Sequence, residues 1–144
     1  MGCHGGAGTT TLATLVPGAR DLGAFDTKRH GTQGLEEDLV LVARDSVSAS
    51  VRAAEVVNIL GFLGLRITAL VVVAETPGRI PADARSRLRL LEGQTSAPVF
   101  FPYVSQFRYV NTPDVASAKL PRKAQQAIDQ IIAAGERAGR RNPS

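Results

Sequence analysis

The chain has 144 residues, which is the length of one domain, and its composition of 44% hydrophobic and 21% charged residues is that of a globular protein. The net charge of +4 is mildly basic, and the single cysteine excludes an intrachain disulfide and a cysteine-rich metal site. No apolar run is long enough to span a bilayer and no signal-peptide pattern opens the sequence, so a cytoplasmic location is expected.

A glycine-rich loop stands at the start of the chain. The residues predicted to bind phosphate there are Gly5, Gly6, Ala7, Gly8, Thr9, Thr10 and Thr11. Glycine lets backbone N–H groups converge on an anion, and the helix that follows adds its own free N–H groups. In the phosphate-loop pattern G-x-x-x-x-G-K-[ST], Gly8 fits the second glycine and Thr10 fits the Mg²⁺-binding hydroxyl. Cys3 and Thr9 replace the first glycine and the lysine, so a tightly packed strand-to-helix turn remains the alternative.

A short helix is predicted over residues 10–16, where Pro17 and Gly18 end it. Only two residues precede Cys3, so the strand that normally carries such a loop is expected to be missing or minimal, or else the protein begins upstream of Met1. Cys3 itself is expected to be an inert, buried thiol. Residues 21–34 are interpreted as a loop, in which Asp26 and Thr27 are candidates to approach the phosphate site.

Three strand–helix units follow. Strands are expected at 38–43, 67–74 and 97–104, and helices at 48–63, at 81–91 and from 121 onward, with Ser48 as the first N-cap. The continuously apolar run 67–74 predicts a central strand, whereas Pro98 and Pro102 favour the sheet edge for 97–104. The arginines at 85, 87 and 89 indicate either a solvated helix face or a small anion-binding patch.

This alternation predicts an α/β fold, a three-layer parallel sheet with helices on both faces. Ligands of such sheets bind at the carboxyl ends of the strands. We expect one domain over residues 1–138 and a basic, disordered tail over 139–144.

The stretch His4-Gly-Gly-Ala-Gly-Thr-Thr-Thr-Leu-Ala13 resembles the deviant phosphate loop K-G-G-x-G-K-T-T-x-x-A of the MinD/ParA-like ATPases, and the runs at 38–50, 67–74 and 99–107 resemble their later strands. The resemblance implies a reduced P-loop fold that binds ATP or ADP, with Mg²⁺ at Thr10. His4 and Thr9 stand where that family has its two lysines, so His4 and Arg44 become candidate substitute cations. A site that holds no cofactor is the alternative.

Two further features of that family are expected to be lacking. One is the apolar strand that ends in the magnesium-binding aspartate. The other is the base-contacting asparagine, at whose place Ala74, Glu75 and Thr76 stand. The resemblance therefore implies a non-catalytic or weakly nucleotide-binding scaffold module that acts through a protein partner or a homodimer. Small actinobacterial proteins with an H-G-G-A-G loop, carried near mobile or conjugative elements, look similar. The alternatives are a weak ParA-type ATPase in partitioning or positioning, and a nucleic-acid binder using the arginines of 85–89 and the basic residues of 119–123.

Overall fold

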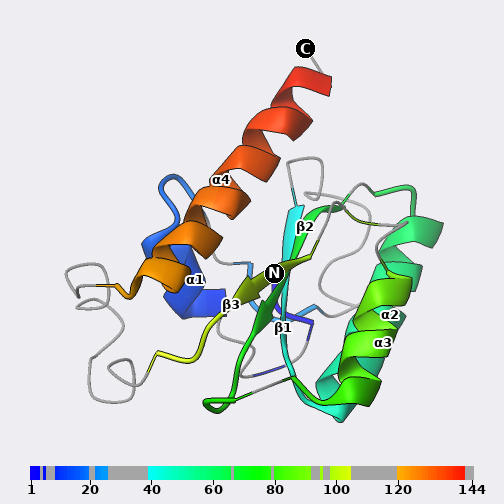
Figure 1. Cartoon of the computed structure of the whole chain (residues 1–144). Helices are drawn as coiled ribbons and strands as arrows, with labels where there is room; N and C mark the ends of the chain where they lie inside the picture. The colour runs from blue at the N-terminus through cyan, green and yellow to red at the C-terminus, as the bar shows by residue number, and fades with distance from the viewer. Residues whose placement is uncertain are drawn as a thin grey trace.

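A computed structural model of the chain describes residues 1–3, 5, 9–19, 22–25, 39–65, 67–78, 80–91, 95, 98–104 and 120–141. Helices and strands alternate along them, as the sequence predicts (Figure 1). The elements are α1 (Thr9–Leu15), β1 (Leu39–Arg44), α2 (Val47–Phe62), β2 (Ile67–Val73), α3 (Ala82–Leu90), β3 (Val99–Phe101) and α4 (Arg122–Arg141). The protein is therefore of the α/β class.

The sheet is parallel, and its three named strands lie in the order β1-β2-β3. All seven residues of β2 are buried, which confirms its predicted central place and explains why its sequence is apolar without alternation. The third strand is shorter than predicted, because β3 pairs only with the last part of β2, from Val71 to Val73. Its place at the end of the order is the expected one.

The first three residues extend this sheet beyond β1. The backbone nitrogen of Met1 donates to the Val40 carbonyl at 2.8 Å, and that of Cys3 donates to the Val42 carbonyl at 2.8 Å. The Val42 nitrogen donates back to the Met1 carbonyl at 2.9 Å, so the pairing with β1 is parallel and continuous. The segment in front of the glycine-rich loop therefore pairs with β1 as a short strand over residues 1–3.

A further short segment pairs with the other side of residues 1–3. The Gly2 nitrogen donates to the Gly23 carbonyl at 2.9 Å, and the Phe25 nitrogen donates to the Gly2 carbonyl at 2.7 Å. This pairing is also parallel. The interpretation of residues 21–34 as a loop is thus wrong for 23–25, which continue the sheet; residues 20–21 and 26–38 lie outside the described part of the chain.

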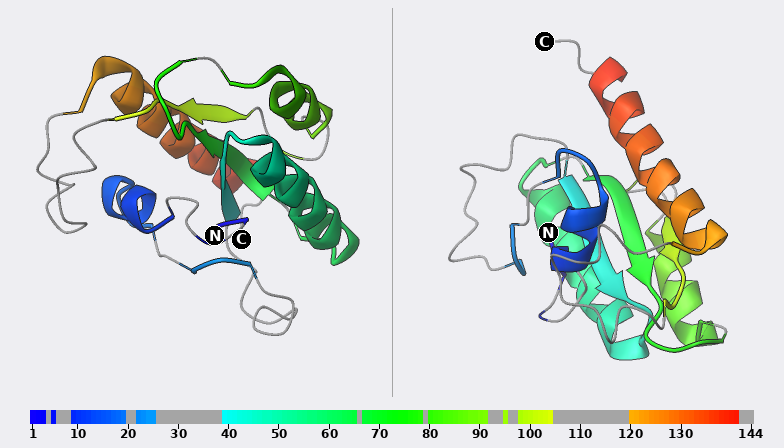
Figure 2. Two further views of the ribbon diagram at one scale, coloured as in Figure 1. Left: turned by 90° about the horizontal axis from the view of Figure 1, so that it is seen from below. Right: turned by 90° about the vertical axis from the view of Figure 1, so that its left-hand side faces the viewer.

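Helices cover both faces of the sheet (Figures 1 and 2). Alternate residues of β1 and β2, such as Leu41 and Leu70, pack against α2 and α3 in one core. Their neighbours Val42 and Val71 pack against α1 and α4 in a second core on the opposite face. This two-sided burial is why the strand sequences lack a polar face.

Two predicted helix boundaries are wrong. The N-cap of α2 is Ser46 instead of Ser48, since the Ser46 hydroxyl oxygen accepts from the Ala49 nitrogen at 3.2 Å. The last helix continues to Arg141, so residues 139–141, which we expected in a disordered tail, are helical. The buried stripe of α4 follows helical spacing and consists of Ala124, Ala127, Ile128, Ile131 and Ala134.

Candidate functional site

The carboxyl ends of the strands meet at one edge of the sheet, and the chain leaves two neighbouring strands there in opposite directions. After residues 1–3 it continues into α1, whose Leu12 belongs to the α4-side core. After β1 it continues into α2, whose Val56 and Leu60 belong to the core on the other face. Neighbouring strands whose connections diverge to opposite faces form a topological switch point, where open parallel sheets bind their ligands.

The glycine-rich loop starts at this switch point. Cys3 ends the first strand, Gly5 is exposed in a turn, and α1 begins at Thr9, with Thr10 and Thr11 in its first turn. Four predicted loop residues, His4, Gly6, Ala7 and Gly8, lie outside the described residues. A Cβ atom placed on Gly5 would meet nothing within 4 Å, so the expected steric need for glycine is not found at this position.

Helix α1 is shorter than the usual phosphate-binding helix, but its first turn is compatible with an anion. Helix α1 has seven residues, so it forms about two turns and has a smaller dipole than a long helix. The first turn of α1 contains no acidic residue, so the helix itself would not repel a phosphate bound by the loop. A ligand would depend chiefly on the backbone of the loop and on nearby cations.

Cys3 is an unreactive thiol, as expected. Its side chain is fully buried in the α2-side core. Burial raises the pKa of Cys3 from 9.0 to about 12, against smaller opposing effects of the N-terminal ammonium and Arg52. Thiolate is the nucleophilic form, so burial disfavours reaction at Cys3, which packs in the core at the start of the glycine-rich loop.

Arg44 is the candidate cation that the structure describes at this edge. It is the last residue of β1, the strand next to residues 1–3, and its side chain is partly buried. Side chains alternate along a strand, so Arg44 belongs to the same face as Val40 and Val42, the face that α1 covers. The sequence prediction of a cation close to the loop is therefore compatible with the positions of the two strands.

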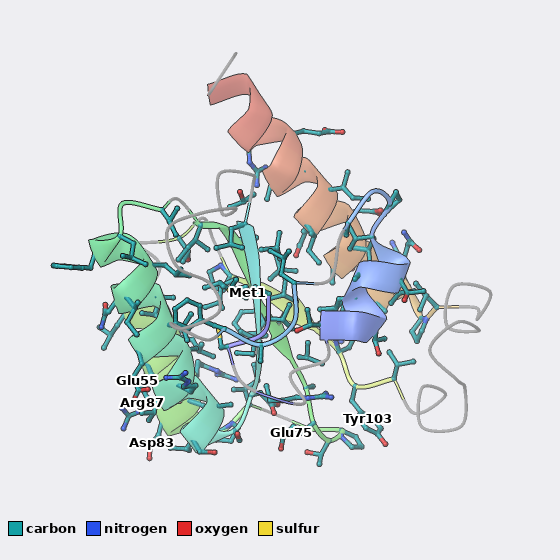
Figure 3. All side chains as sticks on the ribbon, turned by 180° about the vertical axis from the view of Figure 1, so that it is seen from behind. Met1, Glu55, Glu75, Asp83, Arg87 and Tyr103 are labelled. Carbon is teal, nitrogen blue, oxygen red and sulfur yellow. The ribbon has the colours of Figure 1, made fainter. Side chains whose placement is uncertain are left out.

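A buried carboxylate joins the turns that follow β1 and β2. Asp45 is 7% exposed, and its Oδ1 atom accepts a hydrogen bond from the Glu75 backbone nitrogen at 3.2 Å. Glu75 is exposed, and Tyr103, which follows β3, lies at the same edge of the molecule (Figure 3). Two turns at the carboxyl ends of the strands are thus tied together, and Asp45 is a structural residue that its neighbours in sequence do not reveal.

The segment before Asp26 is likewise not recognisable from the sequence alone. Leu22 and Phe25 are apolar, and residues 23–25 pair with Gly2, so an apolar stretch that ends directly before an aspartate does occur between the loop and β1. The signal was short and contained glycine and alanine, which made it resemble a loop. Asp26 and Thr27 themselves lie outside the described residues.

The predicted basic surface is divided. Arg85, Arg87 and Arg89 are exposed on α3, whereas Arg122 and Lys123 are exposed at the start of α4, on the other side of the sheet. Lys119 lies outside the described residues. These cations do not form one continuous nucleic-acid surface within the described part of the chain.

Within the described residues, no cluster of three or more His, Cys, Asp or Glu side chains is suited to hold a metal ion. In the same part of the chain, no helix combines the length and the apolarity needed to cross a membrane. Comparison with known proteins gives no match: no family model, no curated protein and no solved structure matches the chain.

Proposed function

We propose that this protein is a nucleotide- or phosphate-binding module of P-loop type that acts as a binding or scaffold protein. The ligand would be bound by the glycine-rich loop that connects Cys3 to α1. The observation that carries the proposal is the divergence of α1 and α2 from neighbouring strands, because it puts the glycine-rich loop at the edge where parallel sheets bind ligands.

Arg44 would provide positive charge that Thr9 does not. A cation on the strand next to the loop can donate charge-assisted hydrogen bonds to a phosphate, each worth about 1.5–3 kcal/mol. The partly buried position of Arg44 supports this role, because a guanidinium is more effective where water is partly excluded. We assign Arg44 to ligand binding and no catalytic step.

Hydrolysis is not part of the proposal, because His4 and Thr9 replace both lysines of the resembling family. However, one reason for expecting no ATP hydrolysis was the lack of a magnesium-binding aspartate, and this reason is weakened by the place of Asp26 in the sequence. Asp26 directly follows a segment paired to the loop-bearing strand, and carboxylates are ordinary ligands of Mg²⁺. The experiment must therefore measure turnover as well as binding.

Calorimetric titration of the full chain with ATP, ADP and inorganic pyrophosphate, first with Mg²⁺ and then with EDTA, tests the proposal. Binding of at least one of them is expected. Arg44→Gln should weaken it by about tenfold or more, the equivalent of one charge-assisted hydrogen bond. Arg122→Gln, an exposed charge on α4, is the matched control and should leave the affinity unchanged.

Phosphate release is measured in the same samples. Turnover that disappears in Thr10→Ala or Asp26→Asn would replace the scaffold proposal by a weak ATPase. Absence of heat with all three compounds, at concentrations of about 1 mM, would refute ligand binding at the loop. Equal losses in Arg44→Gln and Arg122→Gln would show that net charge, and not the site, attracts the ligand.

A further inference from the structure

The outer surface of α3 presents an unusual set of side chains on the α2/α3 side of the molecule, where Figure 3 shows Asp83 and Arg87. Only Ala84 and Leu88 of this helix are buried. The exposed residues include three arginines and Leu90, whose relative exposure is 79%. The helix contains no lysine, and arginine is the cation enriched in protein interfaces while lysine is depleted there.

The charges of α3 are balanced on one flank and unbalanced on the other. Asp83 and Arg87 are four positions apart with opposite sign, which stabilises a helix. Arg85 and Arg89 are also four positions apart but carry like charge, which destabilises it. Neither of these two forms an ion pair with a residue that the structure describes. Glu92, three positions after Arg89, lies outside the helix and the described residues.

Helix energetics explain only part of this pattern. Arg87 and Arg89 lie in the last turn of α3, where cations interact favourably with the helix dipole. Arg85 lies in the first turn, where a cation is unfavourable. The pair Arg85 and Arg89 therefore weakens an already short helix, and an anionic partner would remove that repulsion.

Small residues lie between the charges. With about 3.6 residues per turn, Ala82, Ser86, Arg89 and Leu90 project on the side opposite buried Ala84 and Leu88. Ala82 and Ser86 have short side chains, so the backbone of another helix can approach closely at this crest. Leu90 offers an apolar contact at one end of it.

We propose that this crest of α3, together with Arg85 on the flank next to it, docks an acidic amphipathic helix of a partner protein. Two carboxylates one helical turn apart on that partner match the spacing of Arg85 and Arg89, because both pairs have the same i, i+4 geometry. An apolar side chain of the partner covers Leu90. The proposal is independent of any ligand at the glycine-rich loop.

Other occupants fit less well. A second copy of this chain carries the same net charge of +4, so charge repulsion disfavours it at a basic surface. Nucleic acid would pair with the arginines through its phosphates but would leave Leu90 without an apolar contact. The roles of Leu90 and of the arginines can therefore be separated by experiment.

The test uses a fluorescent synthetic helical peptide with glutamates at i and i+4 beside a leucine, titrated with the full chain at low salt. Fluorescence anisotropy should show binding with a Kd below about 1 mM. Arg85→Gln combined with Arg89→Gln should weaken binding by about tenfold, as expected for two exposed ion pairs. Leu90→Ser should weaken it severalfold while preserving every charge.

The control is Arg122→Gln combined with Lys123→Gln, which removes the same charge from exposed positions of α4. Unchanged binding in this control supports the proposal, and an equal loss overturns it, because binding would then follow net charge. A duplex DNA of equal charge serves as the competing probe. Tighter binding of the DNA with no effect of Leu90→Ser would overturn a protein partner, as would absence of peptide binding by the wild-type chain.

Discussion

The burial of Cys3, in the short strand over residues 1–3, can be tested by measuring the free energy of unfolding at different pH values. Its side chain is fully buried, and burial raises its pKa from 9.0 to about 12. The native protein therefore keeps the thiol proton at a pH at which the unfolded chain has lost it. This contribution to stability is complete below pH 9 and is lost progressively as the pH rises toward 12.

The magnitude follows from the shift. Within that window, each pH unit lowers the free energy of unfolding by about 1.4 kcal/mol. Between pH 8 and pH 10 only about one pH unit lowers the stability, because the unfolded thiol starts to ionise near pH 9. The free energy of unfolding is therefore expected to fall by about 1.4 kcal/mol. In urea this corresponds to a midpoint lower by roughly 0.5–1.4 M.

The assay is urea unfolding at the two pH values for the wild-type chain and for Cys3→Val, which has a side chain of similar size but no proton to lose. Lysines and tyrosines titrate in both proteins, so the difference between the two isolates the thiol. The wild type should lose about 1.4 kcal/mol more than the variant. Identical pH dependence would refute the reasoning, because it would mean that the Cys3 thiol is not buried.

Other substitutions test the fold by thermal or urea unfolding. Ser46→Ala should cost about 1 kcal/mol because it removes the N-cap of α2, whereas Ser48→Ala should cost less than about 0.5 kcal/mol; equal costs would contradict the observed boundary. Leu70→Ala should cost about 2–5 kcal/mol in the centre of β2, and Phe100→Ala, at a half-exposed edge position, less than half of that. Asp45→Ala should lower stability by about 1 kcal/mol while Asp45→Asn, which keeps the accepting oxygen, should lower it less; the reverse order would exclude the hydrogen bond to the turn after β2.

Much of the fold can be predicted because its signals are local. The run 67–73 contains seven apolar or β-branched residues, and only a strand buried on both faces accounts for that. The buried stripe of α4 repeats at helical spacing, which is a local signal in the sequence. The N-cap of α2 is harder to predict from the sequence, because Ser46 and Ser48 both precede the apolar stripe and only the backbone geometry decides between them.

The rest depends on pairing between distant residues. A three-residue strand such as 1–3 has no periodicity, and it becomes recognisable only through its hydrogen bonds to Val40 and Val42. The same holds for residues 23–25. Asp45 follows a strand and looks like a turn residue, so its burial beneath the next turn could not be deduced from its neighbours in sequence.

The pairing of the N-terminal strand also has a consequence for the order in which the protein folds. Met1 bonds to a residue 39 positions away, and every partner of residues 1–3 lies later in the chain. On the ribosome residues 1–3 emerge before their partners, which are first residues 23–25 and then β1. Long-range parallel pairing of strands is slow compared with helix formation. The full pairing of residues 1–3, from which the glycine-rich loop starts, therefore forms only after β1 has been made.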